Sequence, residues 1–249
     1  MTIHFLKNKK FNKNQLQKIY MIKAIIFDLD DTLYPEKSFV QSGFLMVSNY
    51  LYKKYKISSK KVFNILKIDF KNGVRKKNFD VLLDKLKLEK IKKDRLVKKL
   101  VRIYNNHFPS IFLFPDSFIF LKKNKKNFKI GLLTNGKRSV QKKKIEALKI
   151  KKYFRAIFIN SFFQENDLER SKSAFKYLLK KLKSSPKETI YVGDNPLRDF
   201  KAAKELGLVT VRIKRKKGEY KDIFFSQENK ADYEISNLLE LEKVIKKIK

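Results

Sequence analysis

The chain has 249 residues, of which 43% are hydrophobic, enough to bury the core of one large domain or of a domain with an insert. It has no cysteine and only two histidines, so disulfides, thiolate catalysis and cysteine-ligated metals are excluded, and chemistry must rest on carboxylates, hydroxyls and lysines. The formal net charge is +36, but lysine is spread through almost every segment, which favours a solvated basic surface over a nucleic-acid-binding face.

The first 20 residues are polar and rich in lysine. They lack the apolar stretch of a secretory signal, and no stretch of the chain approaches the ~20 apolar residues of a membrane span. We therefore expect a soluble, cytoplasmic protein without a membrane partner. Because Met21 stands directly before the first strand signal, we interpret residues 1–20 as an N-terminal extension or a misassigned start, with a transit peptide as the less favoured alternative.

Five short apolar runs predict strands that are buried on both faces of a parallel sheet. The runs are residues 23–28, 129–134, 156–159, 189–193 and 209–213. Segments with helical spacing of apolar residues separate the later runs. Alternation of buried strands and helices is typical of an α/β fold with a doubly wound, Rossmann-like parallel sheet.

The first two predicted strands are separated by a gap that is far longer than one crossover helix. Apolar residues in this gap recur at helical rather than strand spacing. We therefore predict an all-helical cap domain over residues 36–113, inserted into a core domain formed by residues 21–35 and 114–249. Pro115 and Asp116 suit the first turn of the helix that leads back to the sheet.

Polar side chains follow three of the predicted strands at their carboxyl ends, where ligands bind in parallel α/β sheets. They are Asp28, Asp30 and Thr32 after the first strand, Thr134 and Asn135 after the second, and Asp194 and Asp199 after the fourth. Because these strand ends meet at one edge of the sheet, we expect the side chains to lie close together.

The sequence Asp28-Leu29-Asp30-Asp31-Thr32 resembles Asp-x-Asp-x-Thr, the first motif of the haloacid dehalogenase-like (HAD) hydrolase superfamily. Leu132-Leu133-Thr134-Asn135-Gly136 is similar to the second motif, and Gly193-Asp194 followed by Asp199 is similar to the fourth. The resemblance covers residues 22–248 and implies a phosphatase-type member with the HAD core and an α-helical cap after the first motif, as in subfamily IA.

The resemblance implies that Asp28 is the nucleophile and forms an aspartyl-phosphate. Asp30, two residues later, would protonate the leaving alkoxide and then deprotonate the attacking water. Members that break carbon–halogen bonds lack an acid at this place in the motif. The presence of Asp30 therefore favours hydrolysis of phosphate esters over dehalogenation.

The resemblance also implies a Mg²⁺ cofactor. Asp28 and Asp194 would bind the ion together with the backbone carbonyl of Asp30, since Mg²⁺ takes one or two carboxylates and completes its shell with water and phosphate oxygen. Asp199 would orient a bound water or the lysine of the third motif. The phosphate-binding residues that the second motif implies are Thr134 and Asn135.

The third motif of the family departs from its pattern in this chain. The motif is a lysine, usually followed by proline, a few residues before a phenylalanine on the next helix. An ungapped match to Phe175 places Glu169 at the lysine position and Arg170 at the proline. Lys172 could supply the phosphate-binding cation if the backbone shifts, and Arg170 is the second candidate.

We predict Mg²⁺-dependent hydrolysis of a small phosphorylated metabolite, such as a sugar phosphate, phosphoglycolate or a nucleoside monophosphate, because a closing cap admits only a small substrate. Ser38, Phe39 and Ser42 are candidate substrate contacts, although core packing is the simpler interpretation of Phe39. One alternative is a phosphomutase, which shares the four motifs. Another is a catalytically weak HAD-like protein that binds nucleic acid through its basic surface. The oligomeric state is unknown from sequence.

Overall fold

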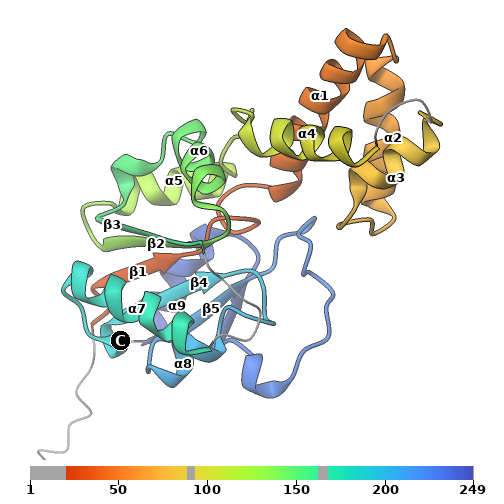
Figure 1. Ribbon diagram of the computed structural model, residues 1–249. Helices are drawn as coiled ribbons and strands as arrows, with labels where there is room; N and C mark the ends of the chain where they lie inside the picture. The colour runs from red at the N-terminus through yellow and green to blue at the C-terminus, as the bar shows by residue number, and fades with distance from the viewer. Residues whose placement is uncertain (1–20, 89–92, 162–167, 249) are drawn as a thin grey trace, which may run out of the picture.

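The computed structural model describes residues 21–88, 93–161 and 168–248 (Figure 1). Its core is a sheet with the strand order β3-β2-β1-β4-β5-β6, in which all neighbouring pairs are parallel. The strands are β1 (Ala24–Phe27), β2 (Lys129–Asn135), β3 (Ala156–Asn160), β4 (Thr189–Gly193), β5 (Val209–Ile213) and β6 (Tyr233–Ile235). The predicted doubly wound α/β fold is confirmed, because the chain runs outward from β1 in one direction and then in the other.

Helices cover both faces of the sheet, and alternating strand residues supply the two apolar layers. Ile25 and Phe27 of β1 belong to the layer that includes residues of α5, α6 and α9, whereas Ala24 and Ile26 belong to the layer with α7 and α8. These helices are α5 (Pro115–Asn124), α6 (Arg138–Ala147), α7 (Leu168–Leu182), α8 (Lys201–Glu205) and α9 (Leu241–Ile248). Short 3-10 helices are η1 (Lys151–Tyr153), η2 (Pro186–Glu188), η3 (Gln227–Asn229) and η4 (Leu238–Glu240).

Of the five α-helices that the structure describes between β1 and β2, the first four gather away from the sheet, as Figure 1 shows. They are α1 (Glu36–Tyr55), α2 (Ser59–Lys71), α3 (Asn78–Lys85) and α4 (Lys93–Asn106), and we call them the helical unit. Helices are therefore present where the sequence predicts the inserted cap, while the domain boundaries stay a prediction. Gly43 allows α1 and α4 to approach, since a Cβ there would lie 2.4 Å from Cδ2 of Tyr104.

Two further predictions concern the ends of elements. Helix α5 begins at Pro115, in the first turn as expected. The carboxylate of Asp116 accepts hydrogen bonds from Arg215 and from the backbone N–H of Leu238 (both 2.6 Å), so it ties α5 to the C-terminal part of the core. The predicted extension, residues 1–20, lies outside the described residues. Within the described ranges, the helices are all too short or too polar to cross a membrane.

Candidate active site

Three loops meet at the carboxyl edge of the sheet. Phe27, the last residue of β1, is in register with Leu132 of β2 and Val192 of β4. The next residue, Asp28, donates its backbone N–H to the carbonyl of Val192 (2.9 Å). Asp28 is therefore placed between the end of β2 and the end of β4, as the sequence predicts.

The side chain of Asp28 is buried, and its Oδ2 atom has no hydrogen-bond partner among the described residues. Burial raises the pKa of this carboxyl well above its ordinary value, and the negative charges of Asp199 and Asp30 raise it further. Arg198 opposes the shift. Asp28 is thus a carboxylate whose charge is incompletely compensated, with one oxygen available to a ligand.

Asp194 follows β4 and is buried in the same place. Burial raises the pKa of Asp194 well above its ordinary value, and the negative charges of Asp199 and Asp28 raise it further. Mutual repulsion of this kind requires that the carboxylates lie near one another in a poorly solvated place. The register of β1 with β4 places both residues at the same edge of the sheet, so Asp28 and Asp194 lie near one another there.

Asp199 lies against the backbone of the loop that follows β4, next to Gly193 and Asn195. Oδ2 of Asp199 accepts the backbone N–H of Asn195 (2.9 Å), and a Cβ at Gly193 would lie only 2.4 Å from that oxygen. Glycine at this position is thus needed for a close approach. The Arg198 guanidinium lies 3.7 Å from Oδ1 of Asp199; burial opposes its charge, but Asp199 and Asp28 hold its pKa above the usual range.

These residues fit a divalent cation. Asp28 and Asp194 are buried carboxylates that repel one another, and Oδ2 of Asp28 is unsatisfied, so a bound cation would offset an unfavourable charge. In the described ranges, no three His, Cys, Asp or Glu side chains cluster as a metal site. The protein would therefore supply two carboxylates and the Asp30 carbonyl, and water and phosphate would supply the rest, which is the pattern that Mg²⁺ accepts.

The loop after β2 presents Thr134, which is fully buried and whose hydroxyl has no hydrogen-bond partner among the described residues. Gln141 of α6 donates to the carbonyl of Asn135 (2.7 Å) and fixes this loop. Gly136 has a φ of +130°, a conformation that a side chain would strain. The Thr134 hydroxyl is therefore held at the sheet edge and left available for a phosphate oxygen.

Asp30 has surroundings opposite to those of Asp28. The Lys144 ammonium of α6 lies 2.7 Å from Oδ1 of Asp30, and the Tyr34 hydroxyl donates a hydrogen bond to the same oxygen. The Gln141 amide donates to Oδ2 (3.4 Å). Burial, and then the charge of Asp30, raise the pKa of Tyr34, so its phenol stays a proton donor. Asp30 is accordingly held by three donors.

Asp31 shapes the turn after Asp30. Its φ is +50°, and its carboxylate accepts the backbone N–H groups of Glu36 (2.9 Å) and Glu219 (3.0 Å). The neighbouring carbonyl of Thr32 accepts a hydrogen bond from Arg215 (2.8 Å). The second acid of the Asp-Asp pair thus stabilises the loop that carries the first.

A family model described as haloacid dehalogenase-like hydrolase matches residues 25–213, which include all three loops. The chain belongs to this family. Glyceraldehyde 3-phosphate phosphatase of Methanocaldococcus jannaschii is 34% identical over 235 residues, with 92% of this chain and 99% of the relative covered. N-acylneuraminate-9-phosphatase of Mus musculus is 24% identical over 241 residues, with 91% of this chain and 95% of the relative covered.

Solved structures of the family have the same fold. A HAD-hydrolase of Bacillus subtilis, in a structure bound to magnesium, superposes with a TM-score of 0.61 at 22% identity, covering 90% of this chain and 98% of the other. With the full-length similarity to named phosphatases, the motifs identify this chain as a HAD-like phosphatase of the subfamily IA type.

Lys172, the candidate cation for the third motif of this HAD-like phosphatase, lies on α7. Its ammonium pairs with Glu205 (2.6 Å) and Glu169 (3.0 Å), which raise its pKa in that order. Among the described residues, Lys172 makes no ion pair with Asp28 or Asp30. The structure thus does not join Lys172 to the other predicted site residues, and its phosphate-binding role stays a prediction. The side chain of the second candidate, Arg170, lies outside what the structure describes.

Sequence reasoning missed Lys144 and Gln141, although α6 carries a signal for them. Val140, Ile145 and Leu148 form the buried stripe of this segment, and Lys144 falls within that stripe. A lysine at a core position of an amphipathic helix needs a buried partner. In a chain with 61 lysines and arginines this one is easily overlooked.

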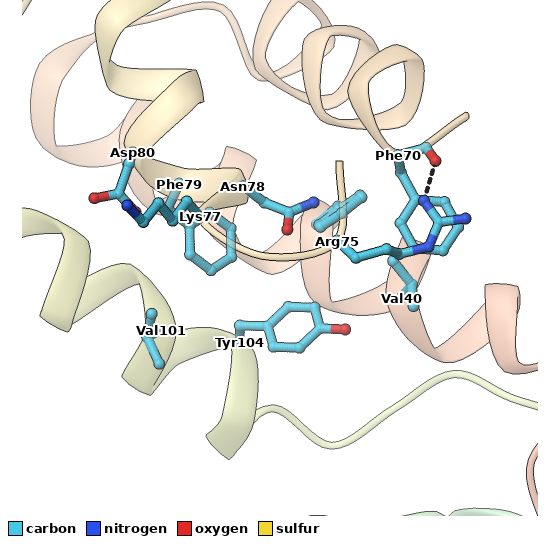
Figure 2. Close-up of a pocket in the computed structure, with 10 residues that line it drawn as sticks. Val40, Phe70, Arg75, Lys77, Asn78, Phe79, Asp80, Val101 and Tyr104 are labelled. Carbon is cyan, nitrogen blue, oxygen red and sulfur yellow. Dashed lines mark hydrogen bonds between the residues drawn. The ribbon is translucent and has the colours of Figure 1, made fainter. Parts of the chain in front are cut away.

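The helical unit contains a cavity of about 270 Å³ (Figure 2). It is lined by Val40, Phe44, Phe70, Arg75, Lys77, Asn78, Phe79, Asp80, Val101 and Tyr104. Burial raises the pKa of Tyr104, and the charges of Glu36 and Asp30 add to the shift, so this ring lies near the first loop. Tyr104 therefore lines the cavity and is also affected by the charge of Asp30.

The three candidate substrate contacts after the first motif all have partners within the protein. Ser38 donates to the carbonyl of Pro35 (2.6 Å), and the hydroxyl of Ser42 accepts the backbone N–H of Ser110 (2.9 Å). Phe39 is buried and packs on Tyr104, with ring centroids 5.7 Å apart. Core packing accounts for Phe39, while substrate contact by the two serines stays a prediction.

Proposed function

We propose that this HAD-like phosphatase hydrolyses a small phosphomonoester, in the first place a sugar phosphate, through an aspartyl-phosphate on Asp28 and with Mg²⁺ as cofactor. The observation that carries the proposal is the contrast at one sheet edge. Asp28 and Thr134 each present a buried polar atom without a partner, while the Asp30 carboxylate is held in place beside them. The relatives' names support a sugar phosphate as the substrate.

In the first step, an oxygen of the Asp28 carboxylate forms a bond to phosphorus while the bond from phosphorus to the leaving oxygen breaks. The Asp30 carboxyl gives its proton to that leaving alkoxide. In the second step, the Asp30 carboxylate takes a proton from water as the water oxygen bonds to phosphorus. The bond between phosphorus and Asp28 then breaks, which releases inorganic phosphate and restores both acids.

The loop after β2 would hold the transferred group. The Thr134 hydroxyl and the Asn135 amide bind its oxygens, and a cation from the third motif, Lys172 by the sequence prediction, would add charge. The Thr134 side chain is fully buried, so a hydrogen bond to phosphate would replace no bond within the protein.

Asp28, Asp194 and the carbonyl of Asp30 would hold Mg²⁺. When bound, the ion would neutralise negative charge on the phosphoryl group. Asp199 keeps the Asp194 loop in place through the Asn195 backbone and would orient a water at the site. Without the cation, the anionic ester would meet a cluster of like charges, which the raised pKa values of Asp28 and Asp194 already indicate.

The cavity in the helical unit suits a small substrate. Its volume of about 270 Å³ falls below the range of about 300–1,000 Å³ that is typical for drug-sized ligands. Its walls are mainly apolar and aromatic, with Arg75 and Asn78 among the polar groups (Figure 2). A substrate with a few carbon atoms beyond the phosphate is therefore favoured over a phosphoprotein or a polynucleotide.

A panel of phosphate esters assayed with and without Mg²⁺ tests the proposal. The panel includes glyceraldehyde 3-phosphate, phosphoglycolate, N-acylneuraminate 9-phosphate and a nucleoside monophosphate. We expect Mg²⁺-dependent release of inorganic phosphate from at least one sugar phosphate. Conversion to an isomeric sugar phosphate without phosphate release would show a phosphomutase instead. Inactivity on the whole panel, combined with RNA binding that survives physiological salt, would support the nucleic-acid alternative.

A further inference from the structure

Helix α6 buries a lysine whose charge the reaction scheme above does not use. The Lys144 side chain is 4% exposed, and its neighbours Val140 and Ile145 lie on the same buried face of the helix. Burial of an ammonium group is strongly unfavourable unless it is paired and hydrogen bonded. The partner of such a group therefore shows what the lysine does.

The Lys144 ammonium is directed at Asp30. It lies 2.7 Å from Oδ1 of Asp30, and it lies over the Phe39 ring at 4.4 Å from the centroid. The ring restricts the ammonium from one side, since a cation is attracted to the face of an aromatic ring. Lys144 is thus fixed between a residue of the helical unit and the carboxylate of the first loop.

The same helix also reaches the second oxygen of Asp30. Gln141 lies three residues before Lys144, on the same face of α6, and its amide donates to Oδ2 of Asp30 (3.4 Å). The other amide hydrogen bond of Gln141 goes to the carbonyl of Asn135, so this side chain is itself held. Contacts from one rigid helix to both oxygens restrict the rotation of the carboxyl group as well as its position.

We propose that Lys144 is a positioning residue for Asp30. Together with Gln141, it holds the carboxyl group in the orientation from which the proton is given to the leaving oxygen and later taken from water. This inference rests on the proposed function, because it assigns Lys144 a role only through the acid and base work of Asp30. In this role Lys144 acts through Asp30 and not on the phosphoryl group itself.

Lys144→Met tests the proposal, because methionine keeps the apolar stem and removes the charge. For a sugar phosphate we expect kcat to fall about 100-fold, within the range of general acid–base catalysis, with KM changed less than about threefold. In single-turnover measurements, cleavage of an aryl phosphate should fall much less, since a good leaving group needs little protonation. Lys142→Met, an exposed lysine of the same helix, is the matched control and should leave both rates unchanged.

A double-mutant cycle separates positioning from an independent role. In the Asp30→Asn background, Lys144→Met should lower kcat by less than about threefold, because there is no carboxyl group left to orient. A further loss of the full size seen in the wild-type background would overturn the proposal. Equal losses for the sugar phosphate and for the aryl phosphate in single-turnover cleavage would also overturn it.

Two more variants keep the test decisive if Lys144→Met folds poorly. Lys144→Arg keeps the charge and should retain more than about a tenth of kcat, and a loss as large as that of Lys144→Met would contradict a role for the charge. Gln141→Leu should reproduce the leaving-group dependence with a smaller loss. If Asp28→Asn and Asp30→Asn keep activity, the proposed function itself fails. If Asp28→Asn is inactive, Asp30→Asn is slowed to a low but measurable kcat and Lys144→Met is unaffected, this inference alone fails.

Discussion

Asp28 and Asp30 stand two positions apart on one loop, yet their surroundings are opposite. Asp28 has an unpaired oxygen, and burial and further carboxylates raise its pKa. Asp30 receives hydrogen bonds from Tyr34, Lys144 and Gln141. A nucleophile must remain open to substrate and cation, whereas an acid and base must keep one orientation. The comparison shows that side chains from the loop after β4 and from α6 give two identical residues different surroundings.

The largest expected effect follows from replacing Asp28, the acid whose Oδ2 atom has no hydrogen-bond partner among the described residues. Asp28→Asn should lower turnover by at least about four orders of magnitude, since the amide cannot form the aspartyl-phosphate. The metal-free variant should unfold at a higher temperature than the wild type, because a repelling buried charge is gone. Phosphate release and a thermal unfolding curve check both parts. Retained activity, or a collapsed fold, would remove the distinction between the two acids.

The second prediction concerns pH and Mg²⁺. The folded pKa values of Asp28 and Asp194 lie above their ordinary value of 3.8, so the metal-free folded state binds more protons than the unfolded state. Its stability therefore falls as pH rises from about 4 through the folded values. Cation binding requires the deprotonated acids, so the rise in Tm caused by Mg²⁺ should grow as pH rises from about 4 through the folded pKa values.

Unfolding curves with Mg²⁺ and with a chelator measure that difference. Asp194→Asn is the control and should lose most of the stabilisation by Mg²⁺ at every pH. A Tm shift that is independent of pH, or one that persists in this variant, would place the cation elsewhere.

The third prediction concerns the close approach of the Asp199 carboxylate to Gly193. Gly193→Ala would put a Cβ 2.4 Å from Oδ2 of Asp199. It would therefore disrupt the hydrogen bond that this oxygen accepts from the backbone N–H of Asn195. We expect the free energy of unfolding to fall by about 1–3 kcal/mol, as for other overpacked sites. Denaturant unfolding measures it. In an Asp199→Ala background the same substitution should cost much less, and equal costs would contradict the steric explanation.

The smallest expected effect comes from an exposed ion pair that contrasts with Lys144 and Asp30. Arg75 of the helical unit donates to both carboxylate oxygens of Glu219 in the core, at 2.7 and 3.0 Å, with both side chains well exposed. Arg75→Ala should lower the free energy of unfolding by less than about 1 kcal/mol, and less still at high salt. Lys76→Ala is the control. A loss of about 3 kcal/mol or more, the size expected when a buried ion pair is broken, would contradict the low value assigned to this exposed pair.

Much of the core follows from local sequence. The strands β1 to β5 are continuous apolar runs, and each lies within one or two residues of its predicted range. Strand β6 was missed because it has only three residues, including the exposed Glu234, and pairs only at the edge of the sheet. A strand this short has no pattern of its own, and its pairing with β5 determines it.

The site was predictable where strand ends carry acids, and less so where helices reach in from elsewhere. The edge positions of Asp28 and Asp194 follow from strand order alone. The contact between Lys144 and Asp30 joins residues 114 positions apart. The core position of Lys144 on α6 signals a buried partner, but it does not say which residue that partner is. The sequence likewise suggests Lys172 for the third motif on local grounds. Glu169 is a local partner at i,i+3 on α7, whereas the pairing with Glu205 emerges only from the packing of α7 on α8.

The most direct test of the account is to identify the phosphorylated residue. The Asp30→Asn variant is mixed with an aryl phosphate and Mg²⁺, quenched in acid and reduced with borohydride, which converts an aspartyl-phosphate to homoserine. Peptide mass spectrometry should find homoserine at position 28, and not at Asp194 or Asp199. Unmodified Asp28 in an enzyme that has released its aryl alcohol, or homoserine at another acid, would contradict the assignment of Asp28 as nucleophile.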